Sequence, residues 1–326
     1  SKQLAKEQGQ REKKKTYKVR NWKEYNQTLV NRGKVEFWIT EEALKDWENQ
    51  KKTGKRGKPQ LYSDIAIETS LMVGQVFHLP LRQTEGFVDS ILKKLDSDLN
   101  TPDYSTLSLR QERLPIQIRT RSLGAEPLHI AIDSTGAKVY GEGEWKVRQH
   151  GWSKHRTWKK LHVGVNEVTG DIVLGEVTGN DTADSEMLAP LLSQLPKDHP
   201  IEQVDADGAY DRRSCYRALA ERKVTHVVIP PQRNANIWQH GNSRQERLAR
   251  DENLRRIRKI GRKRWKEESG YHARSLAEVT MFRLKTIFTD KVQGRLFSSQ
   301  RVQLLLRCKA LNLMTTMGTP DSYLVA

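Results

Sequence analysis

Four polar side chains share one face of a predicted helix in the stretch YHARSLAEVTMFRLK. They are Tyr271, Arg274, Glu278 and Lys285. Because an α-helix turns by about 100° per residue, the four fall within a sector of about 60°. The adjacent stripe, which would seat the helix on a core, is Ala277, Met281, Leu284 and Phe288. A surface helix with one Arg–Glu pair at i, i+4 is the simpler interpretation, but solvation alone poorly explains a carboxylate between an aromatic hydroxyl and two cations.

Two aspartates follow apolar segments that alternate like strands. Asp133 ends LHIAID, and Asp207 lies in VDADGAYD directly before a glycine. A carboxylate in such a position either caps the end of a strand or serves as a metal ligand at the carboxyl edge of a sheet. Together with Glu278, the two aspartates form a set of hard oxygen ligands suited to Mg²⁺ or Mn²⁺. Asp205 and Asp211 are nearby competitors for the role of Asp207.

The elements that must position these acids are strands in the middle of the chain. Alternating or β-branched runs predict strands at 128–133, 137–141, 161–167, 171–179, 203–207 and 225–230. Helical periodicity appears between the later strands, at about 184–195 and 211–223. A final helical segment at 297–317 would close this part of the fold. Strands followed by alternating helices and strands predict an α/β domain.

The amino-terminal part has helical periodicity instead. Ser63 can cap a helix that ends near residue 80; a second helix covers about 81–95 and a short third one 104–114. The third helix offers three residues for contacts with DNA: Thr106, Ser108 and Arg110. This order resembles a helix-turn-helix DNA reader. An ordinary helical bundle remains the alternative.

The charge of the chain points to a polyanionic partner. Its 326 residues contain 57 Lys and Arg against 40 Asp and Glu, a net charge of +17. Nucleic acid is the first candidate, and no apolar run is long enough for a membrane span. Cys215 and Cys308, the only cysteines, lie in apolar periodic segments and are expected in the core. Residues 1–20 are expected to form a basic flexible arm, and residues 51–59 a basic linker or surface loop.

A second basic region interrupts the strand–helix alternation at about residues 231–270. Within it, residues 244–266 contain eleven Lys and Arg and three Asp and Glu, a net charge of 11 − 3 = +8. A solvated basic helix is the simplest account, but a DNA backbone would offset the repulsion between these cations. The residues proposed to bind DNA there are Arg255, Arg258, Lys263 and Trp265. Trp265 could instead pack in the core.

Several motifs resemble one family of proteins. The Tyr-x2-Arg-x3-Glu-x6-Lys spacing is similar to the signature around the catalytic glutamate of bacterial insertion-sequence DDE transposases. IDSTGAKVYGEGEWKVRQHG and VDADGAYD, in this order, resemble the IS-five family, and the likeness extends over most of residues 60–326. The resemblance implies that Asp133, Asp207 and Glu278 are the catalytic and metal-binding triad, and that Tyr271, Arg274 and Lys285 contact DNA.

The same resemblance implies a fold and a domain order. A helical DNA-binding domain is expected at 21–115, and a ribonuclease-H-like catalytic domain at 116–326 with the basic insertion before the last catalytic helix. The implied partners are double-stranded DNA, as terminal inverted repeats and as target, and further copies of the chain in a dimer or larger synaptic complex. The implied cofactor is a pair of Mg²⁺ ions, for which Mn²⁺ can substitute.

The implied activity is cleavage at the element ends followed by transfer of the 3′-OH strand to target DNA. The implied setting is the bacterial cytoplasm, at the nucleoid. A stand-alone metal-dependent nuclease is one alternative, and a catalytically silent DNA-binding regulator is another. The joining of a pre-cut 3′-OH end separates the transposase from the nuclease, and Mg²⁺-dependent nicking of plasmid DNA separates both enzymes from the regulator.

Overall fold

The computed structural model describes residues 16–49, 60–139, 158–239 and 247–325. A six-stranded mixed sheet lies at its centre, in the order β4-β3-β2-β5-β6, with β7 pairing the far end of β2. The strands are β2 (Leu128–Val139), β3 (Trp158–Asn166), β4 (Ile172–Thr178), β5 (Ile201–Asp205), β6 (His226–Val228) and β7 (Lys291–Val292). β2, β3 and β4 are antiparallel, whereas β5 and β7 run parallel to β2, and β6 runs parallel to β5. This topology is consistent with the predicted ribonuclease-H-like core.

Helices cover both faces of the sheet. The first face packs on the short helix α8 (Leu188–Leu192) and on α9 (Arg213–Glu221) through a cluster that includes Ile130, Ile132 and Leu174. The opposite face packs on α12 (Ser275–Phe288) and α13 (Phe297–Met317) through a second cluster. All four residues of the predicted apolar stripe of α12 are buried. Because alternate residues of a strand point to opposite faces, every second side chain of β2 faces α12.

The strand β2 differs from the prediction of two separate strands. It runs without a break through residues 134–136, because it pairs with β3 continuously from Ile130 to Lys138. Asp133 is therefore an internal residue of a strand, opposite Val163. The interpretation of Asp133 as a cap that terminates a strand is wrong for this reason.

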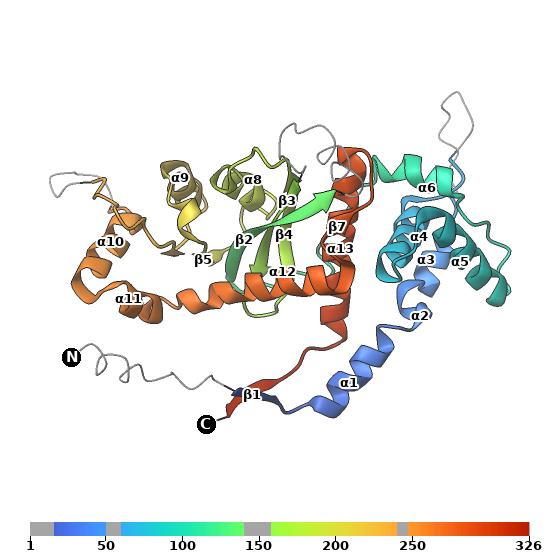
Figure 1. The fold of residues 1–326 in the computed structure, drawn as a ribbon, viewed down its shortest axis with the longest axis horizontal. Coiled ribbons are helices and arrows are strands. Elements are labelled where there is room, and N and C mark those ends of the chain that lie inside the picture. Colours follow the sequence, from blue (N-terminus) through green and yellow to red (C-terminus); the bar gives the residue numbers. More distant parts are fainter. Residues whose placement is uncertain (1–15, 50–59, 140–157, 240–246, 326) are drawn as a thin grey trace, which may run out of the picture.

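In the described part of the chain, six helices precede the sheet. They are α1 (Trp22–Asn31), α2 (Val35–Trp38), α3 (Glu41–Lys45), α4 (Asp64–Val76), α5 (Leu81–Lys94) and α6 (Tyr104–Gln111). The Ser63 hydroxyl accepts a hydrogen bond from the backbone N–H of Ala66, which confirms the predicted cap of α4. Figure 1 shows α4, α5 and α6 grouped together on the opposite side of α13 from the sheet.

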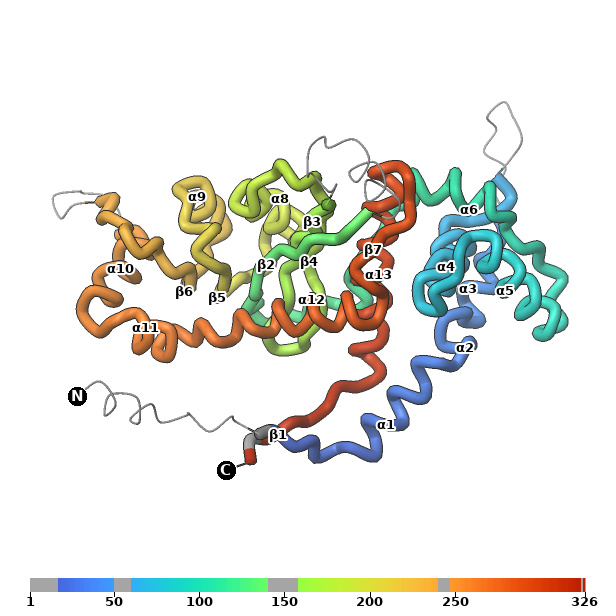
Figure 2. Tube along the Cα trace, in the orientation of Figure 1, coloured from blue at the N-terminus to red at the C-terminus, as the bar shows by residue number. Residues whose placement is uncertain are grey.

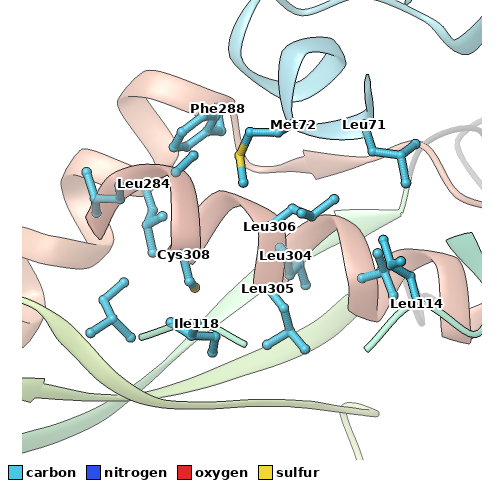
Figure 3. Close-up of a cluster of buried hydrophobic side chains, with 14 of the residues drawn as sticks. Leu71, Met72, Leu114, Ile118, Leu284, Phe288, Leu304, Leu305, Leu306 and Cys308 are labelled. Atoms are coloured by element: carbon cyan, nitrogen blue, oxygen red, sulfur yellow. The ribbon is translucent and has the colours of Figure 1, made fainter. Parts of the chain in front are cut away.

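The amino-terminal helices and the sheet share one hydrophobic core. Figure 3 shows Leu71 and Met72 of α4 facing Leu306 of α13, while Leu305 lies on the side of Ile118 and the sheet. Cys308 is also buried there, and Cys215 is buried against α8, as expected for small core residues. Thus α13 packs against the amino-terminal helices on one side and against the sheet on the other. The boundary predicted at residue 115 lies within this continuous apolar cluster.

The two ends of the described chain meet. Strand β1 (Thr16–Val19) pairs with β8 (Ser322–Val325) in an antiparallel ribbon, which lies below the body of the molecule in Figure 2. The predicted flexible arm at 1–20 therefore ends in a strand, because residues 16–19 find a pairing partner some three hundred positions away. The predicted loop at 51–59 lies outside the described residues.

Candidate active site

Asp133 is held on β2 by two hydrogen bonds. One carboxylate oxygen accepts the backbone N–H of Ser134 at 2.8 Å, and the other accepts Nη1 of Arg274 at 3.0 Å. Burial is the largest influence on this carboxyl group and raises its pKa; Asp207 and Glu278 raise it further, against the opposing effects of Ser134 and Arg274. The repulsion indicates that the three acids are close enough to interact.

Asp207 follows β5, the fourth strand of the central sheet in chain order. Its carboxylate accepts the backbone N–H of Ala209 at 2.8 Å and caps a single 3₁₀ turn, η2 (Gly208–Tyr210). β5 is parallel to β2, with Asp205 opposite Ala131. This register brings the end of β5 beside Asp133.

Glu278 approaches from α12. The predicted helical stretch is observed, although its first four residues form a 3₁₀ turn, η3 (Tyr271–Arg274), before α12 begins at Ser275. The Glu278 side chain is 55% exposed and forms an ion pair with Nη2 of Arg274. One guanidinium group thus joins Glu278 to Asp133.

Arg274 is the centre of this arrangement. Its side chain is only 17% exposed, and its guanidinium carbon lies 5.5 Å from the centre of the Tyr271 ring. Burial lowers the pKa of Arg274, but Tyr271, Glu278 and Asp133 outweigh it and raise the pKa overall. Arg274 therefore serves as the cation that Asp133 and Glu278 share.

The donor chemistry fits a hard divalent cation. Carboxylates from two strands and a helix supply oxygen ligands, and the raised pKa of Asp133 reflects burial and negative charge that a cation would offset. Among the described residues, no three acidic, histidine or cysteine side chains are already grouped closely enough to hold an ion. Glu278 would have to exchange its contact with Arg274 for the ion.

The remaining residues of the signature lie nearby. Tyr271 is partly buried, with its ring 6.2 Å from the Trp265 ring and Lys266 Nζ 4.6 Å from its centre. Burial raises the pKa of the Tyr271 hydroxyl, which keeps it a hydrogen-bond donor at neutral pH. Lys285, one turn from the end of α12, is exposed and lines a small cavity beside residues 135–137 of β2.

The DNA-binding residues predicted on α6 have different surroundings. Thr106 donates its backbone N–H and its hydroxyl to Asp103, the cap of α6. Arg110 is bound by Asp64 at 2.6 Å and by the carbonyl oxygen of Tyr62. Ser108 is exposed and lines a cavity of about 960 Å³ between α4, α5, α6 and the start of α13. Of the three, Ser108 is the one that faces open space.

The basic insertion contains α10 (Ala249–Ile260) and α11 (Arg262–Glu268). Arg255, Arg258 and Lys263 are exposed on these helices, as a surface for DNA requires. Trp265, in contrast, is 2% exposed and donates its indole N–H to Asn253. Its apolar ring packs in the interior, so the structure corrects its expected role as a DNA contact to packing.

Two competing aspartates have partners elsewhere. Asp205 is fully buried and accepts Nε2 of Gln203 at 3.0 Å. Burial, together with Asp205, raises the pKa of the neighbouring Glu167 to about 9. Asp211 is bound by the buried Arg250. Glu167 and Arg250 were not among the predicted site residues, because nothing in their local sequence reveals a distant partner.

The geometry defines an α/β protein in which one arginine joins an acid of a strand to an acid of a helix, and a third acid follows the neighbouring parallel strand. Two family models, both described as Transposase DDE domain, match the chain, one over residues 30–142 and the other over residues 124–313. The second match covers more than half of the chain. The chain belongs to the DDE transposases, which are enzymes that act on DNA and generally use divalent metal ions. Across the described residues, no helix has both the length and the apolar character needed to cross a bilayer.

Proposed function

We propose that the protein is the transposase of a bacterial insertion sequence of the IS-five branch. It binds the terminal inverted repeats of its element, cleaves at the element ends and joins the freed 3′-OH to target DNA. The Tyr271, Arg274, Glu278 and Lys285 spacing supports this assignment within the family. The observation that carries it is the bridge that Arg274 forms between Asp133 and Glu278, with Asp207 two residues beyond β5, the strand that runs parallel to β2 and beside it.

Asp133, Asp207 and Glu278 would hold the metal ions. Two Mg²⁺ ions, or Mn²⁺ in their place, would supply Lewis-acid activation of the attacking hydroxyl group and charge stabilisation for the leaving oxygen. The chain itself provides rigid supports for these ligands. Asp133 is fixed inside a strand and Asp207 is fixed as the cap of a turn, whereas the exposed Glu278 would have to leave its ion pair with Arg274.

Arg274, Lys285 and Tyr271 would hold the phosphate groups next to the cleaved bond. A guanidinium group can bind two phosphate oxygens at once. With Glu278 and Asp133 as metal ligands, the Arg274 guanidinium would be available for such a contact. Lys285 adds a second positive charge on the same face, and the protonated Tyr271 hydroxyl can donate a hydrogen bond to phosphate.

The helices at 21–115 would bind the inverted repeats, and the insertion at 231–270 would bind the DNA backbone. On α6, Ser108 is available for a base edge, while Thr106 and Arg110 fix the orientation of the helix in this structure. Contacts from Arg255, Arg258 and Lys263 to phosphate would carry no sequence information. Two element ends must be held together, so the active form is a homodimer or a larger synaptic complex.

The test is the variant Glu278→Gln, which keeps the size of the side chain and removes its charge. We expect binding to an inverted-repeat duplex to remain within twofold of wild type, and cleavage in Mg²⁺ to be lost. A duplex with a pre-cut 3′-OH end then tests joining by the wild-type protein. Cleavage at the wild-type rate by Glu278→Gln would remove Glu278 from the mechanism, and cleavage without joining would indicate a nuclease.

A further inference from the structure

One arginine of the basic insertion does not face solvent. Arg250, in the first turn of α10, is 3% exposed, although it belongs to the +8 stretch. Its Nε donates to one carboxylate oxygen of Asp211 at 2.7 Å, and its Nη2 reaches the other at 3.4 Å. Its Nη1 donates to the carbonyl oxygen of Asn236 at 2.8 Å and to Asp251 at 3.2 Å. Arg250 is therefore a buried, multiply bonded cation and not a part of the DNA-facing surface.

Asp211, the main partner of Arg250, lies at the other end of a short turn from Asp207. The single turn η2 separates Asp207 from Asp211. Within this turn, the backbone N–H of Tyr210 donates to the Asp207 carbonyl oxygen and that of Asp211 to the Gly208 carbonyl oxygen. Tyr210 is 1% exposed and anchors the turn in the core. A displacement of Asp211 would consequently move the turn that Asp207 caps.

Arg250 is itself held rigidly. Its guanidinium carbon lies 3.7 Å from the centre of the Trp238 ring, and that ring packs edge-on against Tyr216 of α9 at 5.7 Å. The carboxylate of Asp251 accepts the backbone N–H of Trp238 and of Gln239. The backbone N–H of Gln232 donates to Asp211 at 3.0 Å. The ion pair of Arg250 and Asp211 thus connects three segments: the turn that Asp207 caps, the residues that follow β6, and α10.

We propose that Arg250 is a positioning residue that fixes Asp207 through Asp211, and so couples the DNA-binding insertion to the metal-binding acids. This inference rests on the proposed role of Asp207 as a metal ligand. Arg250 acts at a distance from the reacting atoms, by holding the far end of a turn whose near end is Asp207. A guanidinium group is required because its planar fork binds both oxygens of Asp211 while its face stacks on Trp238.

The variant Arg250→Lys keeps the charge and loses both the fork and the stacking. In the full chain, without DNA, we expect the affinity for Mn²⁺, measured by electron paramagnetic resonance, to fall about tenfold. The rate of cleavage at saturating DNA should fall by a similar factor, and the KM for the inverted-repeat duplex should stay within twofold. In metal-free buffer, the backbone N–H groups of residues 209–211 should exchange with deuterium faster than in wild type.

The control is Arg301→Lys, which alters another two-oxygen ion pair, with Glu176 at 2.7 and 3.0 Å, away from the Asp207 turn. It should lower the melting temperature and leave Mn²⁺ affinity unchanged. If Arg250→Lys does not fold, Asp211→Asn weakens the same contact with almost no change in side-chain size and should reduce Mn²⁺ affinity in the same direction.

If folded Arg250→Lys binds Mn²⁺ as tightly as wild type and its amides exchange at the wild-type rate, Arg250 does not position Asp207. It then contributes to stability only. The variant Asp207→Asn separates this result from a failure of the proposed function. If Asp207→Asn binds Mn²⁺ as wild type does, Asp207 is not a ligand and the proposed triad is wrong. If Asp207→Asn loses binding while Arg250→Lys keeps it, only the positioning role fails.

Discussion

Replacement of Arg274 by glutamine tests whether this residue is the counter-ion of the acids. In wild type, Arg274 and Asp133 form a largely buried pair, with side chains 17% and 18% exposed. Removal of one partner of a buried pair costs about 3–5 kcal/mol, and partial exposure reduces this to about 2–3 kcal/mol. The contact with Glu278, which is 55% exposed, adds at most about 0.5 kcal/mol. For a chain of this size we expect the melting temperature to fall by about 5 °C in EDTA.

Mg²⁺ should restore part of this loss. With the proposed metal ligands, the ion would compete with Arg274 for the carboxylates of Asp133 and Glu278 in wild type, and would have no such competitor in the variant. If removal of the competitor raises the Mg²⁺ affinity tenfold, saturating Mg²⁺ adds about 1.4 kcal/mol more stability to Arg274→Gln than to wild type. The assay is thermal unfolding followed by circular dichroism, with and without Mg²⁺.

The pH dependence of the same melts has a defined sign. The pKa of Asp133 is raised in the folded state, so its ionisation opposes folding. Its contribution to stability is therefore complete below its unfolded pKa and decreases as the pH rises through its folded pKa. Arg274 lowers the folded pKa, so in Arg274→Gln the decrease should extend to higher pH.

The control for these melts is Arg301→Gln, which removes the cation of a separate ion pair. It should lower the melting temperature and respond to Mg²⁺ as wild type does. An unchanged melting temperature of Arg274→Gln in EDTA, or an equal response of Arg274→Gln and wild type to Mg²⁺, would refute the counter-ion role.

Three further predictions concern the core and the insertion. Glu167→Gln should melt higher than wild type at pH 8 and equally near pH 4, because burial raises the pKa of Glu167 to about 9 and its ionisation opposes folding; equal melting at both pH values would contradict this. Gly164→Ala should lower the free energy of unfolding, measured in urea, by about 1–3 kcal/mol, because the added Cβ would lie 2.7 Å from a Leu174 methyl group. Gly86→Ala, on the open side of α5, should raise this free energy by up to about 1 kcal/mol. Replacement of Arg255 and Arg258 by neutral residues should weaken binding to inverted-repeat and unrelated duplexes alike. It should also reduce the dependence of log affinity on log salt concentration by about one per lost phosphate contact; a loss of affinity confined to the repeat would mean that α10 contacts bases.

Local signals in the sequence predicted α4, α5, α6 and α13, but not the three short helices that precede them. Ser63 caps α4 as expected, and α13 begins and ends at the predicted residues 297 and 317. Such signals are legible because capping and apolar periodicity act within a few residues. The error in β2 has the opposite origin. Ser134, Thr135 and Gly136 have turn-forming composition, and only pairing with β3, far along the chain, keeps them extended.

The acids of the site could be proposed from sequence, but their neighbours could not. Asp133, Asp207 and Glu278 stand in motifs whose order resembles a known family, which supplied the long-range information. Arg250 has no such motif and looks like the other cations of its helix. Its burial with Leu254, one turn later on α10, marks the inward face of that helix, yet a buried arginine is recognised only when its carboxylate partner is known.

The helix α13 explains why the amino-terminal helices and the α/β part need not act independently. Arg307, on this helix, is 6% exposed, and burial lowers its pKa to about 10. Its guanidinium donates to Gln75 of α4 at 2.8 Å and to the carbonyl oxygen of Thr289, directly after α12, at 3.4 Å. One buried cation therefore links the helix group proposed to bind the element end with the end of the helix that carries Glu278. Because close-packed interiors transmit strain, a shift of α4 on the proposed DNA binding would be transmitted to α12 through α13 and would change the orientation of Glu278.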